Sequence, residues 1–378
     1  MTDEAHQKAV SGEAWEEFCD TLKSAGRLVV EHSTDDLDRI EGFRYLSRLA
    51  RGGLFSYLEN RDRVSSDILP IPFNLKIGCD NPDADYRSVP VDPAHTYRIH
   101  GTRGTVNFLS LNVLSGGLGA GAKPPGRDGT VTFNDPDPDG MVDVIVSVEE
   151  PSLADGQQWL RMSTDASMVA VRNFFLDRTS ERSSELTIEC LDPPTPTPPP
   201  LAGDQLAHGL AMAGLYVHGV ADRFLGWVED LFMARPNTLE FLPDDDPTGA
   251  WGDPNQDFRH GYWTLDEGQV LVIRVPAIDA YYWNFQLNNM WEESLDYRNL
   301  SVTVNQHTAV YEPDGSALIL IADEDPGIGN WMDTAGHRRG TMGLRYNQVV
   351  ADIPPDVTVM PVSRLGELAG ARPTGEMG

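Results

Sequence analysis

The stretch Tyr281-Tyr282-Trp283-Asn284-Phe285-Gln286-Leu287-Asn288 alternates apolar and polar side chains with a period of two. Successive side chains of a β-strand point to opposite faces, so the pattern predicts a strand with one face of each kind. The polar face collects Tyr282, Asn284, Gln286 and Asn288, and the apolar face collects Tyr281, Trp283, Phe285 and Leu287. Such a row of phenol and amide groups suits a ligand that carries hydroxyl or carbonyl groups, although many sheets simply turn a polar face to solvent. We expect it to line a ligand site.

The same period recurs on both sides of this stretch, in short runs of β-formers separated by Pro, Gly, Asn and Asp. The predicted strands cover residues 95–100, 105–114, 141–148, 168–175, 186–190, 262–265, 270–276, 281–288, 301–304 and 317–323. Many short strands at this spacing, with turn signals between them, are typical of an antiparallel β-sandwich.

Helical periodicity appears in three other places. Between Glu13 and Val30 one stripe contains Trp15, Phe18, Leu22, Ala25 and Val29. After a cap signal at Asp35 a second stripe contains Leu37, Ile40, Phe43, Leu46 and Leu49. A third, longer helix begins near Asp204 and runs to about Leu231. The sequence therefore predicts a mainly β fold with attached α-helices, namely an N-terminal helical hairpin and a central long helix.

These elements suggest five segments along the chain. We expect an N-terminal helical region at 1–75, a first β-rich half at 76–192, a proline-rich linker at 193–203, the long helix with a second β-rich half at 204–362, and a loose tail at 363–378. The two β-rich segments are expected to complete one sandwich or to form its two halves.

Composition limits the classes of partner. The 378 residues carry a formal charge of -29, which repels nucleic-acid backbones and anionic lipid surfaces. The N-terminus lacks the pattern of a secretion signal, and no run of about 18 apolar residues is present. The cysteines Cys19, Cys79 and Cys190 show no CxxC spacing. We expect a soluble cytoplasmic protein without nucleic-acid or membrane partners. The oligomeric state stays open, a homo-oligomer included.

A second informative stretch, Gly329 to Tyr346, mixes glycines with many polar groups. Asp333 lies four residues before His337 and could orient its imidazole as a catalytic base. The alternative is structural, with Asp333 capping the turn and His337 bonding a backbone carbonyl. In the same stretch Trp331 is a candidate for ligand stacking, and Arg345 is expected to pair with a carboxylate.

Motifs for metals and cofactors are missing. Asp80, Asp83 and Asp85 resemble a calcium loop, but Pro82 interrupts it and the required glycine and glutamate are absent. His260, His307 and His337 show no HxH or HExxH spacing, and the chain has no phosphate-binding loop, dinucleotide fingerprint or GxSxG elbow. We expect no metal and no organic cofactor; the alternative is a histidine-based metal site that assembles from distant strands.

Several motifs together resemble the bacterial domain-of-unknown-function family 1214 (DUF1214). They are Asn81–Arg87, Tyr97–Gly101, Tyr282–Leu287, Glu293–Arg298 and the stretch Gly329–Tyr346, and the match covers most of residues 36–350. The resemblance implies a jelly-roll β-sandwich with attached helices. It implies no particular chemistry, because the family is uncharacterised.

Two functions from different classes remain. The first is a cofactor-independent enzyme that acts on a small, partly apolar oxygenated metabolite, with His337 or His260 as acid or base and Asp333 orienting His337. The second is a non-catalytic protein that binds a lipid-like or sugar-like molecule. In both, the ligand-binding residues are Tyr282, Asn284, Gln286, Asn288, Trp291, Trp331 and Arg345. Burial of His337 with both nitrogens bonded to backbone would count against the first.

Overall fold

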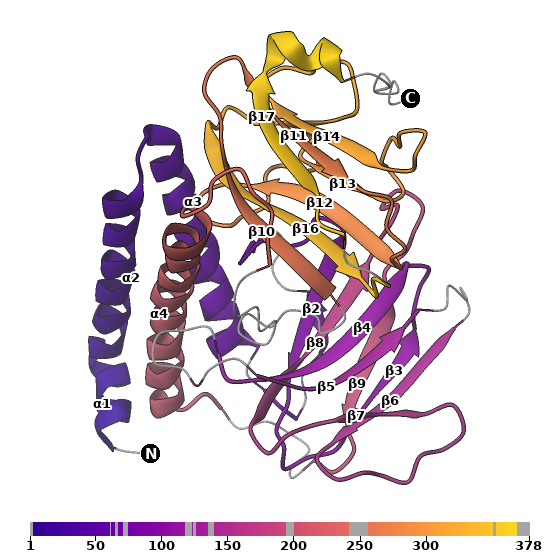
Figure 1. The fold of residues 1–378 in the computed structure, drawn as a ribbon. Coiled ribbons are helices and arrows are strands. Elements are labelled where there is room, and N and C mark those ends of the chain that lie inside the picture. Colours follow the sequence, from indigo (N-terminus) through magenta and orange to yellow (C-terminus); the bar gives the residue numbers. More distant parts are fainter. Residues whose placement is uncertain are drawn as a thin grey trace. The chain divides into compact units, whose positions relative to one another are not determined.

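The computed structural model describes residues 3–60, 62–64, 67–70, 75–117, 123, 126–134, 140–193, 200–241, 256–350 and 353–368. Over these residues the chain forms four β-sheets and accompanying helices (Figure 1). Strand pairing is antiparallel except between β6 (Met141–Ser147) and β7 (Gln158–Arg161) and between β14 (Ala317–Ala322) and β15 (Asn330–Asp333). The expected fold class, mainly β with attached helices, is confirmed.

The described residues divide into two compact units. Residues up to Leu75 and Asp83–Arg223 form the first unit, whereas Lys76–Pro82, residues 224–241 and residues 256–368 form the second. The long helix was expected in the second β-rich half, but almost all of it belongs to the first unit. Conversely, Lys76–Pro82 was expected in the first half and belongs to the second unit.

The helices of the first unit are α1 (Asp3–Ser11), α2 (Glu13–His32), α3 (Asp36–Leu54) and most of α4 (Gly203–Gly226), with a π-helical turn at Phe55–Glu59 after α3. The π-helical turn Trp227–Phe232, which follows α4, belongs to the second unit. As predicted, Asp35 caps α3, because its carboxylate accepts a hydrogen bond from the Asp38 amide at 2.8 Å. Phe18 of α2 packs with Leu210 and Ala213 of α4. The predicted helical hairpin and central helix are therefore present.

Two predicted helix stripes are only partly right. Trp15 is 56% exposed, and Ile40 and Phe43 of α3 are also exposed. The buried face of α3 is rotated relative to the apolar pattern and includes Asp38 and Glu41. Apolar periodicity alone could not assign polar residues to a buried face.

The first unit contains one β-sandwich. One sheet has the order β1-β2-β8-β4-β5 and the other has the order β7-β6-β3-β9. The strands not yet bounded are β1 (Leu69–Pro70), β2 (Ala84–Pro90), β3 (Tyr97–Thr102), β4 (Phe108–Ser115), β5 (Gly126–Phe133), β8 (Ala166–Phe174) and β9 (Glu185–Cys190). Their inner faces bury a shared core that includes Val89, Leu111 and Val171 from the first sheet and Ile99 and Val144 from the second.

The second unit contains another sandwich, with sheets β10-β16-β12-β13 and β15-β14-β11-β17. Its remaining strands are β10 (Gln256–Thr264), β11 (Gln269–Val275), β12 (Tyr282–Asn288), β13 (Thr303–Asn305), β16 (Arg339–Asn347) and β17 (Asp356–Pro361). Trp263, Phe285 and Leu344 of one sheet pack with Ile273 and Ile319 of the other. Each unit thus has its own two-sheet core, whereas the sequence suggested one sandwich built from two halves.

Two predicted segments fall partly outside the described residues. Residues 194–199 of the proline-rich linker and 369–378 of the tail lie outside them. The tail residues before 369 are not loose, because Val362–Glu367 forms a 3₁₀ helix and Leu365 is buried.

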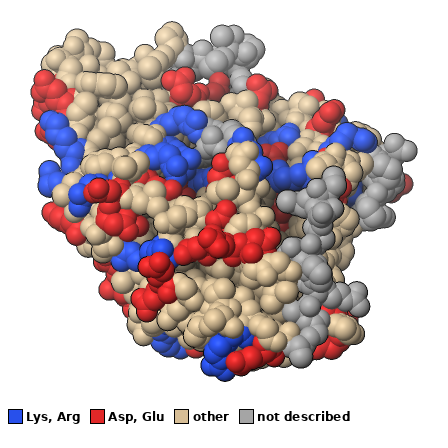
Figure 2. Space-filling model, turned by 90° about the horizontal axis from the view of Figure 1, so that it is seen from above, with Lys and Arg blue, Asp and Glu red and all other residues tan. Residues whose placement is uncertain are grey.

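The surface agrees with the composition. Acidic side chains are interspersed with Lys and Arg on the face shown in Figure 2, with uncharged residues between them. None of the helices in the described ranges has the length and apolar character needed to cross a membrane.

Candidate functional site

The predicted alternation of β12 is confirmed, but both faces of the strand are buried. Trp283, Phe285 and Leu287 enter the core of the second sandwich. Asn284, Gln286 and Asn288 on the other face have 0% exposure. The polar row is therefore an interior surface of the second unit and not a solvent-facing side of the sheet.

The neighbouring strands extend this polar face. Antiparallel partners point to the same face of a sheet, and the register places Phe258, Arg345 and Asn284 in one row across β10, β16 and β12. The next row contains His260, Gly343 and Gln286. A further pairing sets Thr341 beside Asn288. Strand pairing thus brings together candidates that are far apart in the sequence.

The segment Lys76–Pro82 covers the polar face. Asn284 Nδ2 donates to Asn81 Oδ1 at 2.7 Å, and Gln286 Nε2 donates to the Asp80 carbonyl at 2.8 Å. Asn288 Nδ2 donates to Cys79 Sγ at 2.9 Å, while Asn81 Nδ2 donates to the Tyr282 hydroxyl at 3.1 Å. Successive residues of the segment therefore meet successive residues of the polar row.

Gly343 provides the space for this covering segment. A Cβ atom at Gly343 would lie 2.6 Å from the Phe258 ring and 2.8 Å from Cys79 Sγ. These distances are shorter than real Cβ contacts, so any side chain here would displace Cys79 or Phe258.

Arg345 is the cation at the centre of the face. Its guanidinium donates to Gln286 Oε1 and to the Cys79 carbonyl, and it stacks 4.1 Å above the Phe258 ring. The side chain is 3% exposed. A buried guanidinium favours negative charge on its neighbours.

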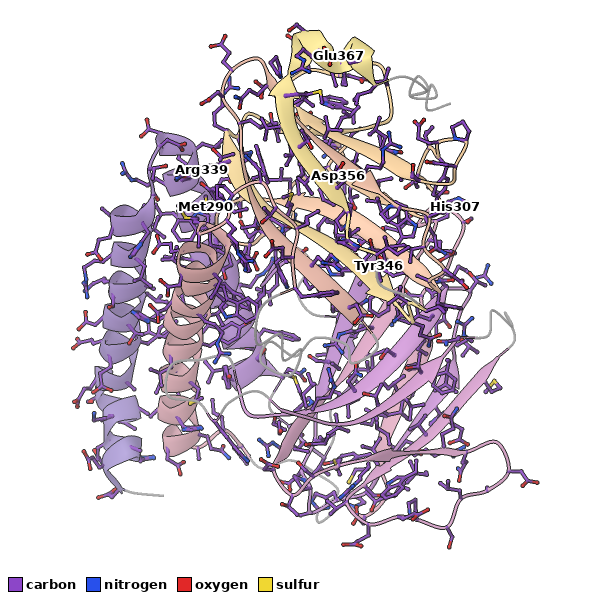
Figure 3. All side chains as sticks on the ribbon, in the orientation of Figure 1. Met290, His307, Arg339, Tyr346, Asp356 and Glu367 are labelled. Atoms are coloured by element: carbon purple, nitrogen blue, oxygen red, sulfur yellow. The ribbon has the colours of Figure 1, made fainter. Side chains whose placement is uncertain are left out.

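Side-chain hydrogen bonds hold the turn after β12 in place. Asn289 organises the turn, because its side-chain oxygen accepts from the amides of Trp291 and Glu293 at 3.0 and 3.1 Å. Asp80 then fastens the covering segment to the turn, since its carboxylate accepts from the Ser294 amide at 2.9 Å and from the Ser294 hydroxyl at 2.7 Å. Met290, within this turn, lies at the Arg339 end of the sheet (Figure 3).

Glu292 is the most unusual residue of the site. It has 0% exposure, and its backbone is left-handed with a φ of 57°. Neither carboxylate oxygen has a partner in hydrogen-bond geometry within the described structure. Burial raises the pKa of Glu292 to about 7, against the opposing influence of the nearby Thr341 hydroxyl and the Arg345 guanidinium. A carboxyl group in this state is neutral in part of the molecules and ionised in the rest at neutral pH.

Cys79 faces the same polar site as Arg345, but its thiol is not reactive near neutral pH. Burial raises the pKa of its thiol to about 12, although Arg345 acts in the opposite direction. The thiol therefore stays protonated near neutral pH and is a poor nucleophile. Its backbone is left-handed as well, with a φ of 58°, and its amide donates to the Glu292 carbonyl at 2.8 Å.

His260 lies on the polar face but is unsuited to act as a base. Its ring centroid lies 3.7 Å from that of Phe258 and stacks at 5.2 Å from that of Phe232. Burial and, to a smaller extent, the Arg345 charge lower its pKa to about 3, so the imidazole is neutral. It lines a small recess of about 20 Å³ together with Phe232, Thr238 and Glu240, which leaves room for about one water molecule.

In the glycine-rich corner, Asp333 and His337 both bond to backbone groups, as the structural alternative predicts. The Asp333 carboxylate accepts from the Ala335 amide at 2.8 Å, and the Thr334 carbonyl accepts from His337 Nδ1 at 2.9 Å. The expected hydrogen bond from Asp333 to His337 does not form, because left-handed conformations at Ala335 and Gly336 turn the chain between them. His337 is also buried. These contacts remove the main support for His337 as the base.

The tryptophan candidates lie in different parts of the second sandwich. Trp331 donates from Nε1 to the Ala322 carbonyl at 2.9 Å and packs with the apolar cluster that contains Val270 and Leu320, on the other sheet of the second sandwich. Trp263 is part of the sandwich core. Only Trp291, which is 2% exposed and precedes Glu292, borders the polar site.

The structure brings together some of the residues that the sequence analysis named, and it adds others. The sequence analysis named Tyr282, Asn284, Gln286, Asn288 and Arg345, which the structure brings together. It missed Glu292, Asp80 and Thr341 as parts of a site and treated Cys79 only by its spacing. The one available signal was the pair of motifs Asn81–Arg87 and Glu293–Arg298, which border the covering segment and the turn.

Comparison with known proteins identifies a relative but no activity. No family model and no curated protein matches the chain. A crystal structure of an uncharacterized protein from Burkholderia cenocepacia is similar, with 35% identity and a TM-score of 0.89 over 95% of this chain and 100% of that chain. A Vibrio parahaemolyticus protein matches with 11% identity and a TM-score of 0.49 over 84% of this chain and 98% of that one. The resemblance to DUF1214 stays a prediction.

Proposed function

The chain belongs to the family of the Burkholderia cenocepacia protein, and we propose that its buried polar face is an acid–base site for a small, partly apolar oxygenated metabolite. Glu292 is the group that takes up and releases the proton. Arg345 stabilises negative charge that develops on the ligand, and the amides of Asn284 and Gln286 orient its hydroxyl or carbonyl groups. In this proposal no cofactor takes part, and the protein works in the cytoplasm, where its three free cysteines stay reduced.

One observation carries the proposal: Glu292 is fully buried, its two oxygens lack well-formed hydrogen bonds, and its pKa is about 7. A buried carboxyl group without partners is costly, and structural carboxylates are normally paired. Strongly perturbed pKa values gather at functional sites, and acid–base catalysis is most efficient when the pKa lies near the working pH.

Access requires movement of the covering elements. Three residues hold the covering segment to the turn. Asp80 accepts from Ser294, the Cys79 amide donates to the Glu292 carbonyl, and Lys76 Nζ donates to the carbonyls of Ser294 and Leu295. A ligand that offers its own acceptors to Arg345 and Gln286 could replace the Cys79 and Asp80 carbonyls. We therefore assign Lys76–Pro82 the role of a plug that a ligand displaces.

A second candidate is binding without catalysis. It is favoured by the fact that the amides of Asn284, Gln286 and Asn288 all donate to protein groups, so the polar row already forms a satisfied network. A lipid-like or sugar-like molecule held by this row would need no proton transfer, and Glu292 would then only tune affinity.

The test compares small molecules that co-purify with the wild-type chain and with E292Q. Gln matches Glu in size but cannot exchange the proton, so a catalytic role predicts that E292Q retains a substrate that the wild type releases. Native mass spectrometry followed by mass spectrometry of the extracted compounds detects it. N284A, which removes an orienting amide, should retain less, and E267Q, at an exposed turn of the same unit, should behave as the wild type does.

The outcomes separate the candidates. Conversion of the retained compound when wild-type protein is added supports catalysis. The same unchanged compound in both the wild type and E292Q supports binding alone. If N284A and E292Q retain the same compounds as E267Q, or if none retains any, the polar face is not the site.

A further inference from the structure

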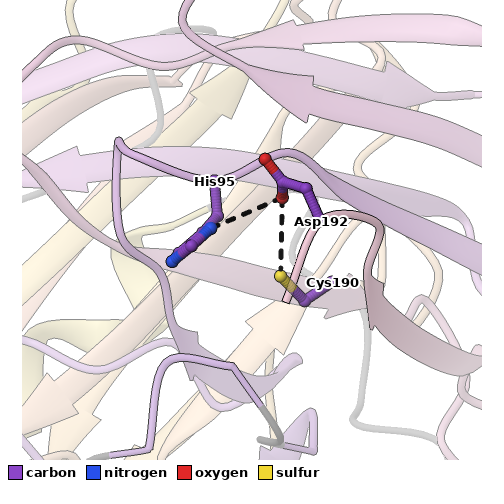
Figure 4. Close-up of side chains that lie close together, drawn as sticks. All are labelled: His95, Cys190 and Asp192. Carbon is purple, nitrogen blue, oxygen red and sulfur yellow. Dashed lines mark hydrogen bonds and ion pairs between the residues drawn. The ribbon is translucent and has the colours of Figure 1, made fainter. Parts of the chain in front are cut away.

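A second cluster of chemically active side chains lies in the first sandwich. His95 precedes β3, Cys190 ends β9, and Asp192 follows β9, so strand pairing between β3 and β9 brings the three together (Figure 4). One nitrogen, one sulfur and one oxygen from these side chains all lie within 4.8 Å of one another.

Backbone contacts hold the cluster in place. The Leu191 amide donates to the Thr96 carbonyl at 2.8 Å, and the Thr96 amide donates to Asp192 Oδ1 at 3.0 Å. The His95 amide closes a turn on the Asp92 carbonyl at 3.0 Å. The two chain segments are thus fastened on both sides of the side-chain cluster, which favours a defined geometry.

The two separations that involve Asp192 match those around a tetrahedral ion. With zinc bonds of the usual lengths to nitrogen, oxygen and sulfur, tetrahedral angles place nitrogen and oxygen ligands about 3.4 Å apart and sulfur and oxygen ligands about 3.6 Å apart. His95 Nδ1 lies 3.5 Å from Asp192 Oδ1, and Cys190 Sγ lies 3.7 Å from the same oxygen. Both distances agree with the tetrahedral values, and the imidazole nitrogen and Cys190 Sγ lie within 4.8 Å of each other.

The imidazole supplies an independent observation. His95 Nδ1 is buried and has no partner in hydrogen-bond geometry among the described residues, although it faces Asp192 at ion-pair distance. A buried ring nitrogen without a hydrogen bond is uncommon, and coordination to a metal would satisfy it.

We propose that His95, Cys190 and Asp192 bind a divalent transition-metal ion of the zinc class, with water at the fourth position. Imidazole nitrogen, thiolate sulfur and carboxylate oxygen are the ligands that zinc prefers. The Cys190 thiol loses its proton to solvent when the metal–sulfur bond forms. The Asp192 side chain is 52% exposed, so an ion can enter from solvent. No CxxC or HxH spacing marks this site, because His95 and the pair Cys190 and Asp192 come from distant parts of the chain.

The test uses the full chain, stripped with a chelator and titrated with Co²⁺ as a spectroscopic substitute for zinc. We expect one equivalent of Co²⁺ to produce a thiolate-to-cobalt charge-transfer band in the near ultraviolet and the intense visible bands of tetrahedral cobalt. Zinc should then displace the cobalt. C190S should abolish the charge-transfer band, and H95Q and D192N should each weaken zinc binding by at least about tenfold in a chelator competition.

Two control variants test whether the cobalt spectrum depends on the three residues of the cluster. C19S removes another half-buried cysteine of the same unit and H100Q removes a histidine of β3 outside the cluster, and neither should change the spectrum. Circular dichroism of each variant checks that it folds. No charge-transfer band in the folded wild type, or a band that survives C190S, would overturn the proposal. So would zinc affinities of H95Q and D192N equal to that of H100Q.

Discussion

Replacing Glu292 with Gln should change how stability depends on pH. The pKa of Glu292 is raised from its ordinary value of 4.5 to about 7, mainly by burial. Each unit of pKa shift corresponds to about 1.36 kcal/mol, so a rise of about 2.5 units corresponds to roughly 3 kcal/mol. The group is completely buried, so solvent screening does not reduce this figure.

The sign follows from proton binding. Below pH 4.5 the carboxyl group is protonated in both the folded and the unfolded chain, and its ionisation costs nothing. Between pH 4.5 and about 7 the unfolded chain ionises while the folded chain keeps its proton, so the free energy of unfolding falls as pH rises. Above pH 7 both states are ionised and the full penalty of roughly 3 kcal/mol is present.

The measurement is urea unfolding of the wild type and E292Q across this pH range. Gln is neutral throughout, so the stability of E292Q minus that of the wild type should rise by roughly 3 kcal/mol between pH 4.5 and pH 7 and then level off. Constant effects of the substitution on packing cancel in this difference. Carbon NMR of the side-chain carboxyls offers a direct reading, because E292Q removes one resonance. For E267Q, at an exposed turn, the difference should stay nearly flat.

A difference that does not change with pH, or that falls as pH rises, would refute the reasoning. It would mean that Glu292 ionises at an ordinary pKa in the folded chain. The acid–base proposal would then lose the observation on which it rests.

Three further predictions concern the surroundings of the site. H337A should destabilise the second unit by about 1–3 kcal/mol in urea unfolding, because it leaves a buried carbonyl without its donor, and unchanged stability would contradict a structural role. G343A should cost about 1–3 kcal/mol because its methyl group meets the Phe258 ring, whereas G366A, with nothing within 4 Å, should be nearly neutral; equal effects would argue against close packing. R345K should abolish ligand retention and lower the melting temperature, since lysine keeps the charge but cannot bond two acceptors as a fork; retention equal to wild type would show that the fork is dispensable.

Local patterns predicted helices α2, α3 and α4 and ten of the strands, but they missed α1 and the strands β1, β2, β5, β7, β15, β16 and β17. Period-two alternation located β12 to within one residue, and the cap signal at Asp35 located the start of α3. They could not predict that the β-rich parts form two sandwiches, because each strand's pattern states only that one face is buried and not against which sheet. Nor could they show that Lys76–Pro82 belongs to the second unit, since that depends on contacts between distant parts of the chain.

The site could be predicted only where it lies on a strand. Asn284, Gln286 and Asn288 stand out because polar residues alternate with core residues, and strand pairing then adds Arg345. Glu292 lies in a turn, where acidic residues are common and carry no periodic signal. Its role in the proposal rests on burial and on the lack of well-formed hydrogen bonds, and both are properties of the folded chain. The glycine-rich corner Gly329–Tyr346 suggested a catalytic pair that the structure does not form. A polar turn whose groups bond to one another can have the same residue types as a catalytic turn.

The backbone conformations of Cys79 and Glu292 bear on the same question. Both are non-glycine residues with positive φ, and such conformations cost of order 1–3 kcal/mol each where tertiary structure imposes them. Asparagine or glycine would adopt them more easily, and the site also holds a carboxyl group without well-formed hydrogen bonds. If the region served stability alone, we would expect a residue better suited to at least one of these positions. Instead, the two strained backbones and the buried carboxyl group all occur where the covering segment meets the turn. Displacing Lys76–Pro82 would release the strain at Cys79 and expose Glu292 in the same step, so the energy stored in the closed form offsets part of the cost of opening it to a ligand.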